Sequence, residues 1–388
     1  MANQAVSLML IAVAVALLPA FSRILRIPST VVEILFGIIL GSLFLGGELG
    51  GDWLPFLAEL GFLLLMFQAG MEINFTMLLG QSRGVFLYQL ALFSATVLLS
   101  MAASFAMGQG LFFALVLSTT SLGLVLPTLR EAGLSRTPMG QTILVAATLA
   151  DFLTLLGITF YVLWHQYGLS IRFIYPLPLF AAFAAILWAA RRWAWWHPET
   201  AERLLLTENT EEWGVRLAMA LLFVFVGVSE IVHLEPVLGA FMGGCIISFV
   251  FREKEILESK ISALGFGFLV PLFFINVGMQ FNPGNVINPE QLKFMVVLLF
   301  SAFAVKMLPL LILPGSGVRG ANRAKAGLLM SSRLSLIIAA AAIGVQEGFL
   351  SREMKDAVIF LALLTCLLGP VLFRLTAGRS AAKAKTRG

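Results

Sequence analysis

Long apolar stretches recur along this sequence of 388 residues and constrain its fold more than any other feature. About 20 apolar residues are enough to cross the hydrocarbon core of a bilayer as an α-helix. Hydrophobic residues make up 59% of the chain and charged residues only 12%, an apolar surplus that a soluble domain could not bury. The sequence therefore predicts an all-α polytopic membrane protein. Thirteen spans are expected, at roughly 4–22, 30–46, 55–74, 84–108, 109–129, 139–164, 171–194, 213–232, 234–250, 262–280, 292–313, 322–345 and 355–373.

Positive charge is distributed unevenly between the connections that join these spans. Connections after odd-numbered spans, together with the C-terminal tail, contain twenty of the 26 Lys and Arg residues, whereas connections after even-numbered spans contain four. Basic residues remain on the cytoplasmic side of a membrane. We therefore expect the N-terminus outside and the C-terminus in the cytoplasm. The net charge of +5 then reflects topology, and no nucleic-acid partner is expected.

The chain is expected to form one membrane domain over residues 1–378, followed by a short basic cytoplasmic tail over 379–388. A polar linker (197–216) separates spans 7 and 8. An offset of seven spans reverses the direction of crossing, as an inverted-topology repeat requires. Spans 5 and 12 correspond under this offset, and both have polar interruptions, STTSLGLVLP (118–127) and MSSRLSLIIA (330–339).

These interruptions predict two broken helices that meet near the middle of the membrane, where many secondary carriers bind ions. Thr120 and Ser121 are candidate ligands on the first of them. The alternative is structural, because hydroxyl side chains in membrane helices also bond their own backbone or help helices pack. That alternative applies equally to Thr119, Ser331 and Ser332.

Three ionisable side chains, Asp151, Lys306 and Arg333, lie well inside predicted spans. A charge at the bilayer centre costs about 2.5–3.5 kcal/mol on insertion scales, so such residues usually mark function. Burial favours the neutral form of a carboxyl group and a bound cation favours the ionised form, so Asp151 could hold either a proton or an alkali cation. A buried salt bridge or a helix-packing hydrogen bond is the structural alternative for Asp151.

Lys306 could act as the partner of an acid, as compensation for the C-terminal dipole of a half-helix, or as a second titrating group. Arg333 lies in the interruption of span 12, where it is expected to bond carbonyls freed by the broken helix. Glu33, near the cytoplasmic end of span 2, is either a funnel-lining acid or an interfacial carboxylate.

Enzymatic chemistry is not indicated by the remaining reactive side chains. All three histidines fall at span ends or in the linker, away from any nucleophile, and both cysteines fall inside spans, where a disulfide framework is not expected. We therefore expect no enzyme activity, no organic cofactor and no catalytic metal.

Five segments have a recognisable pattern: IPSTVVEILFGIILG (27–41), LAELGFLLLMFQAGMEI (57–73), TTSLGLVLPTLREAG (119–133), GAFMGGCIIS (239–248) and FLVPLFFINVGMQF (268–281). They resemble segments of monovalent cation:proton antiporters, especially the bacterial thirteen-span sodium/proton antiporters and the membrane domains of potassium-efflux antiporters. The resemblance runs from about residue 10 to 373, with the motifs in the expected order.

This resemblance implies a core of spans 4–6 and 11–13 with crossed broken helices, and a panel of spans 1–3 and 8–10 that forms a homodimer interface. It matches Asp151 to the essential second residue of the paired motif of the family. Lys306 matches the basic residue of the corresponding core helix, and Thr120 and Ser121 match the polar pair on the first broken helix. A bacterial inner membrane is the implied location.

Two positions depart from the pattern of these relatives. Ala150 occupies the first place of the paired motif, so Lys306 loses its usual acid partner and Asp151 becomes the obvious candidate to pair with it. Relatives often have Arg-Gly-Glu on the second broken helix, where this chain has Arg333, Leu334 and Ser335. These changes leave the choice of ion and the stoichiometry open.

The function expected from these features is exchange of Na⁺ (or K⁺) for H⁺ by alternating access, with the lipid bilayer as the surrounding solvent. Two alternatives remain open at the level of sequence. One is a sodium-coupled symporter of a related inverted-repeat fold, and the other is a membrane sensor that binds an ion without transporting it.

Overall fold

The computed structural model is all helical in the part of the chain that it describes. Besides short pieces between 181 and 196 and residue 284, the described ranges are 2–25, 27–43, 53–73, 82–135, 137–168, 212–232, 234–251, 255–282, 289–313 and 321–385. Each predicted span except the seventh coincides with one helix or with consecutive helical segments. The seventh, 171–194, lies mostly outside the described residues.

Helix length and composition confirm the polytopic membrane class. Within the described ranges, nine helices are long and apolar enough to cross a membrane, or ten if one bent pair counts as a single span. Two further apolar helices are shorter than this limit. The total of thirteen spans stays a prediction.

The helices group into two compact units. Unit 1 comprises residues 1–76 and 163–281, and unit 2 comprises residues 77–162 and 282–388. This grouping confirms the division of spans into 1–3 with 8–10 and 4–6 with 11–13. In unit 1 the elements are α1 (Ala2–Leu25), α2 (Ser29–Leu43), α3 (Trp53–Glu72), α11 (Trp213–Ile231), α12 (Pro236–Val250), α13 (Glu255–Leu264), the π-helical segment η2 (Gly265–Leu269) and α14 (Val270–Met279).

Unit 1 contains a close crossing of α2 and α14 at Gly37 and Gly278. A Cβ atom on Gly37 would collide with the carbonyl oxygen of Ile275, and a Cβ atom on Gly278 would collide with that of Ile34. Small residues of this kind let helix backbones approach closely in lipid, where apolar side chains gain little by leaving the solvent.

A second close crossing joins α3 and α12 at Gly70 and Gly244. Here a Cβ atom on Gly70 would meet the carbonyl oxygen of Phe241, and one on Gly244 would meet that of Phe67. The second crossing therefore has the same construction as the first.

The two crossings also correspond in sequence. The segment around Gly37, LFGIIL (35–40), is similar to MGGCII (242–247) around Gly244. The segment around Gly70, QAGMEI (68–73), is similar to NVGMQF (276–281) around Gly278. Each pair is seven predicted spans apart, so the inverted repeat predicted from the hydroxyl clusters of unit 2 extends to unit 1.

The tenth predicted span is interrupted by the π-helical segment η2. The side-chain amide of Gln68 on α3 donates to the carbonyl oxygen of Ile261 in the turn before it, with nitrogen and oxygen 2.9 Å apart. A π-helical turn leaves its carbonyls without the usual i+4 donors, and the buried amide of Gln68 satisfies one carbonyl at this place.

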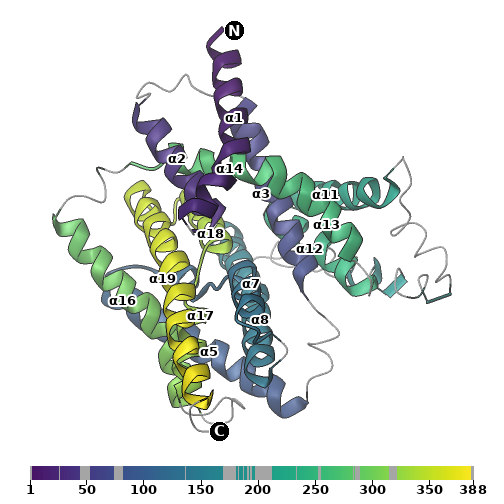
Figure 1. Cartoon of the computed structure of the whole chain (residues 1–388). Coiled ribbons are helices and arrows are strands. Elements are labelled where there is room, and N and C mark those ends of the chain that lie inside the picture. The colour runs from purple at the N-terminus through teal and green to yellow at the C-terminus, as the bar shows by residue number, and fades with distance from the viewer. Residues whose placement is uncertain are drawn as a thin grey trace. The chain divides into compact units, whose positions relative to one another are not determined.

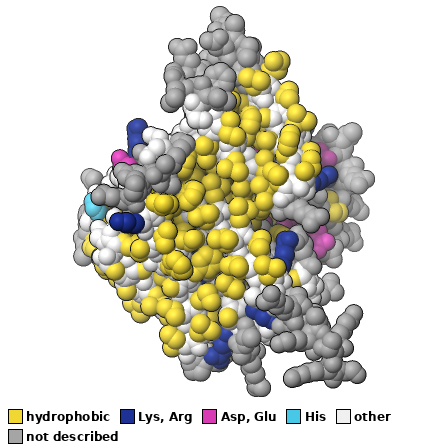
Figure 2. All heavy atoms as spheres, turned by 60° about the vertical axis from the view of Figure 1, so that its left-hand side comes forward, with side chains coloured by type: hydrophobic (Ala, Val, Ile, Leu, Met, Phe, Trp, Pro, Cys, Tyr) yellow, Lys and Arg dark blue, Asp and Glu magenta, His cyan; other side chains and the backbone are white. Residues whose placement is uncertain are grey.

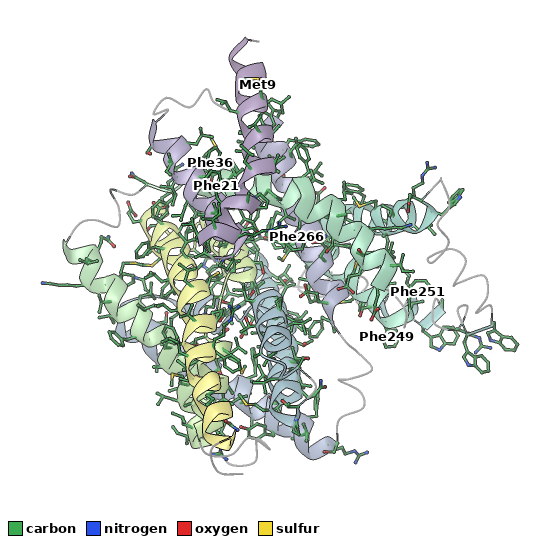
Figure 3. All side chains as sticks on the ribbon, viewed as in Figure 1. Met9, Phe21, Phe36, Phe249, Phe251 and Phe266 are labelled. Carbon is green, nitrogen blue, oxygen red and sulfur yellow. The ribbon has the colours of Figure 1, made fainter. Side chains whose placement is uncertain are left out.

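Large apolar side chains face outward from several helices, as expected for a surface in contact with lipid acyl chains. Met9 and Phe21 on α1 and Phe266 on η2 are exposed, and Figure 3 labels all three. Hydrophobic side chains cover most of the face drawn in Figure 2, and the visible Lys and Arg side chains lie mainly toward its edges.

Unit 2 is built around two broken helices. Its core includes Leu92, Val125, Ile143, Leu329 and Phe373, and α19 packs against α16 and α17 (Figure 1). Its elements are α5 (Arg83–Ala106), α6 (Leu111–Ser118), α7 (Leu122–Glu131), most of α8 (Pro138–Tyr167), α16 (Pro289–Ile312), α17 (Ala321–Met330), α18 (Ser335–Gln346) and α19 (Arg352–Lys385).

Both predicted interruptions are confirmed. Residues 119–121 separate α6 from α7, and residues 331–334 separate α17 from α18, with a bend of 43° between the latter two. Each break leaves the C-terminal carbonyls of one half-helix and the N-terminal amides of the next without intrahelical partners.

Candidate ion-binding site

The break between α6 and α7 creates opposite partial charges inside unit 2. The C-terminus of α6 presents carbonyl oxygens and therefore negative charge, whereas the N-terminus of α7 presents amide groups and positive charge. The three residues of the break, Thr119, Thr120 and Ser121, are buried. Because water does not reach these groups, side chains have to compensate for both helix ends.

Asp151 compensates for the positive end. Its carboxylate atom Oδ2 accepts a hydrogen bond from the backbone N–H of Leu122, the first residue of α7, at 3.1 Å. The other oxygen, Oδ1, is buried and has no hydrogen-bond partner among the described residues. A carboxylate with one anchored and one unfilled oxygen can still accept a proton or coordinate a cation.

Lys306 compensates for the negative end. The ammonium group of this buried α16 residue donates to the carbonyl oxygen of Ser118, the last residue of α6, at 2.6 Å, and to the hydroxyl of Thr120 at 2.7 Å. Within the described residues it forms no ion pair with Asp151. The Lys306–Asp151 pair that was expected because Ala150 replaces an acid is therefore absent. The carbonyl at the end of α6 takes the place of the missing acid.

Arg333 connects both broken helices. Its fully buried guanidinium donates to the backbone carbonyl oxygens of Leu117 and Thr119 at the first break, at 2.9 and 3.1 Å. It also donates to Ser331 at 3.3 Å and to Ala302 on α16 at 2.9 Å, and all four acceptors are backbone carbonyl oxygens. The bonding expected for Arg333 is therefore present, and it extends to both breaks and to α16.

The hydroxyl groups at the two breaks divide into different kinds. Thr119 and Ser331 donate to the carbonyls of Val116 and Gly327, each at 2.8 Å, which matches the structural alternative. The hydroxyl oxygen of Thr120 instead accepts a hydrogen bond from the ammonium group of Lys306. The Ser332 hydroxyl is buried without a hydrogen-bond partner among the described residues. Thr120 and Ser332 therefore both differ from the backbone-bonded hydroxyls of Thr119 and Ser331.

Several buried polar residues of unit 2 were not singled out by sequence reasoning, among them Thr154 and Asp356. Thr154 on α8 is fully buried, and its hydroxyl lies 3.4 Å from that of Ser118. Its position one helical turn after Asp151 was the available signal. Asp356 on α19 is also buried and accepts from the backbone N–H of Asn282 at 3.4 Å. No signal in the sequence singled it out, because it stands at the start of a predicted span.

Glu33 belongs to unit 1, whereas Asp151 and the residues that surround it belong to unit 2. It is 4% exposed, and its Oε2 atom is buried without a hydrogen-bond partner in the described part of the chain. This burial differs from the exposed carboxylate expected at an interface. Its role in a cytoplasmic funnel stays a prediction.

The arrangement around Asp151 suits a hard monovalent cation or a proton. The acceptor atoms in this part of unit 2 are carboxylate, hydroxyl and carbonyl oxygens. Oxygen ligands suit hard cations, whereas nitrogen and sulfur ligands suit zinc and other transition metals. Among the described residues, no three His, Cys, Asp or Glu side chains form a group that could hold a metal ion.

Comparisons with known proteins place nearly the whole chain among transporters of one family. The family model described as "Sodium/hydrogen exchanger, transmembrane" matches residues 10–376. YjbQ of Bacillus subtilis, named as a candidate Na⁺/H⁺ antiporter, is 31% identical over 369 residues, which cover 90% of this chain and 59% of that protein. This chain therefore spans less than two thirds of the length of YjbQ.

Two further proteins match over nearly their full lengths. The Na⁺/H⁺-K⁺ antiporter GerN of Bacillus cereus is 26% identical over 365 residues, which cover 90% of each chain. The solved structure of the sodium proton antiporter MjNhaP1 from Methanocaldococcus jannaschii superposes with a TM-score of 0.70 at 14% identity, covering 97% of this chain and 98% of that one. The latter likeness shows that the fold is shared.

Proposed function

The chain belongs to the sodium/hydrogen exchanger family, and we propose that it exchanges Na⁺ for H⁺ across a bacterial inner membrane, with Asp151 as the shared site. The observation that carries this proposal is the Asp151 carboxylate at the N-terminus of α7, with Oδ2 bonded to the N–H of Leu122 and Oδ1 buried without a hydrogen-bond partner among the described residues. The name of GerN includes K⁺, so K⁺ is a second candidate substrate.

Competition for one carboxylate couples the two ions. When Asp151 is ionised, the α7 N-terminus stabilises its negative charge and a Na⁺ ion can bind at the unfilled oxygen. When a proton binds instead, the carboxyl group is neutral and the cation loses its counter-charge. Because one group cannot hold both ions, each crossing of the site carries either a cation or a proton.

The proposed alternating-access motion moves unit 2 as one body. Support comes from Arg333, whose hydrogen bonds join α6, the connection after α17, and α16 around the site. Unit 1 would then form the homodimer interface, as the resemblance implies. The charge distribution supports an N-terminus outside and a C-terminus in the cytoplasm.

The proposal is tested in proteoliposomes that contain a pH-sensitive dye, with imposed gradients of Na⁺, K⁺ or Li⁺. The wild-type protein should move protons in response to Na⁺, and Asp151→Asn should abolish this movement because an amide cannot take up or release the proton. Asp356→Asn is the matched control, since it neutralises another buried carboxylate of unit 2 outside the site.

The same assay separates the two alternative functions. A sensor would bind Na⁺ without any cation-driven change in pH, and a symporter would require an organic co-substrate. Exchange of wild-type rate in Asp151→Asn would exclude Asp151 as the shared site, even if the protein transports Na⁺.

A further inference from the structure

Thr154 differs from the other buried threonines of α8. Thr148 and Thr159 each donate their hydroxyl proton to the backbone carbonyl four residues earlier, at 2.8 and 3.0 Å. This internal bond is the usual way for a threonine in a membrane helix to satisfy its hydroxyl. Thr154 lies between them and is fully buried, yet its one hydrogen bond within the described part of the chain is to the hydroxyl of Ser118, at 3.4 Å.

The protons of this hydroxyl pair can be assigned from the bonds of Ser118. The Ser118 hydroxyl donates to the carbonyl oxygen of Leu115 at 2.8 Å, so its single proton is already used. Thr154 is then the donor of the 3.4 Å contact, which is long for a bond between two hydroxyls. No described group then donates to the hydroxyl oxygen of Thr154, and a buried acceptor without a donor costs free energy.

A second unfilled acceptor lies on the same side of α8. Residues three apart on a helix are neighbours on its surface, with Cβ atoms about 5–6 Å apart, and Asp151 stands in this relation to Thr154. The Oδ1 atom of Asp151 is buried without a partner in the described part of the chain. Ala150, four residues before Thr154, shares this side and provides no polar atom.

We propose that Thr154 is a further ligand of the transported cation, with its hydroxyl oxygen binding Na⁺ together with the Asp151 carboxylate. This inference rests on the proposed exchange at Asp151. It gives α8 two oxygen ligands one turn apart, an ionised one and a neutral one. Because the neutral ligand does not titrate, Thr154 sets the affinity for the cation and leaves proton binding to Asp151.

The test replaces the hydroxyl with a methyl group in Thr154→Val. In proteoliposomes, the apparent KM for Na⁺ should rise about tenfold, the effect of losing one polar interaction with a charged group. The rise should persist at alkaline pH, where protons no longer compete for the site. Thr154→Ser keeps the oxygen and should retain the wild-type KM.

Thr148→Val and Thr159→Val are matched controls on the same helix, because their hydroxyls already bond the backbone. Both should leave the KM for Na⁺ unchanged. If Thr154→Val is not recovered in folded form, Thr154→Ala removes the same hydroxyl and is judged by the same criterion. An unchanged KM in the hydroxyl-free variant, or an equal rise in both controls, would overturn the assignment of Thr154.

A binding measurement in detergent makes the result independent of transport. Na⁺ that binds only the folded protein raises its melting temperature, and this rise should require roughly ten times more Na⁺ in Thr154→Val. If the wild-type protein exchanges Na⁺ for H⁺ and Thr154→Val has the same KM and Na⁺ affinity, only the role of Thr154 is contradicted. A wild-type protein without Na⁺-driven proton movement contradicts the proposed exchange itself.

Discussion

The interactions that stabilise the helix packing inside unit 1 differ from those inside unit 2. In unit 1, α2 crosses α14 and α3 crosses α12 through glycines, so backbone lies directly against backbone. In unit 2, helices are broken, and the side chains of Arg333 and Lys306 donate to the buried carbonyl oxygens that the breaks leave without intrahelical partners. A glycine crossing is steric and offers no charge, whereas the ends of broken helices carry partial charges that bind ions. The difference explains why the candidate site belongs to unit 2.

The largest effect is expected from removal of Arg333. Arg333→Met keeps much of the side-chain length but leaves four buried carbonyl oxygens without their donor. Breaking a buried charged network by removing one member costs about 3–5 kcal/mol. We expect a strongly reduced yield of folded protein and a lower melting temperature. The measurement is thermal unfolding of the purified protein in detergent.

Arg333→Lys provides the comparison for that experiment. A single ammonium group cannot reach carbonyls on three elements at once, so it should restore only part of the stability. Wild-type stability in Arg333→Met would contradict the view that this arginine holds unit 2 together.

The next largest effect is expected at the glycine crossing of unit 1. Gly278→Val forces a side chain against the backbone of Ile34, and overpacking of this kind costs about 1–3 kcal/mol. Gly227→Val is the control, because a Cβ atom on Gly227 meets nothing within 4 Å. The melting temperature should fall in the first variant and change little in the second. A folded Gly278→Val protein should keep the wild-type apparent KM for Na⁺, since unit 1 does not contain the site.

The charge of Lys306 gives a prediction about stoichiometry. Its ammonium group donates to Ser118 and Thr120, and the acceptor at Ser118 is a carbonyl that favours a charged donor. We therefore expect Lys306 to stay charged through the cycle, so that one proton moves per cation. Exchange with Na⁺ as substrate is then electroneutral, and a membrane potential set with a potassium ionophore should leave its rate unchanged. A voltage-dependent rate or endpoint would mean that Lys306 also releases its proton.

The smallest effect is expected for Glu33→Gln in unit 1. Glu33 is buried, and its Oε2 atom has no hydrogen-bond partner among the described residues. A carboxyl group in such surroundings is cheapest in its neutral form, which a glutamine resembles, so the exchange rate should change by less than about twofold. Loss of exchange in Glu33→Gln would place an essential titrating group in unit 1 and would weaken the contrast between the two units.

Much of this organisation could be predicted from the sequence. Apolar length is enough to locate a membrane helix, and hydroxyl residues inside an apolar span indicated both breaks. Asp151, Lys306 and Arg333 were identifiable because a charge inside a span is costly. The bonding of Arg333 to freed carbonyls also followed, since an arginine in a break has those acceptors nearest to it.

Side-chain partners across helices were harder to predict. The bond from Lys306 to Ser118 depends on how closely α16 approaches the end of α6, and no spacing in the sequence records that approach. The glycine crossings of unit 1 depend on pairs more than 170 residues apart, such as Gly70 and Gly244. In the sequence, Thr154 does not differ from other threonines of a membrane helix. Only the structure shows that its hydroxyl contacts Ser118 instead of a backbone carbonyl.

The central claim is that Na⁺ and a proton compete for the carboxylate of Asp151. Its most direct test is proton release from purified, lightly buffered protein in detergent when Na⁺ is added. We predict that the wild-type protein releases about one proton per chain and that Asp151→Asn releases none, while Asp356→Asn behaves as wild type. Na⁺ binding to the wild-type protein without proton release, or equal release from Asp151→Asn, would contradict the claim.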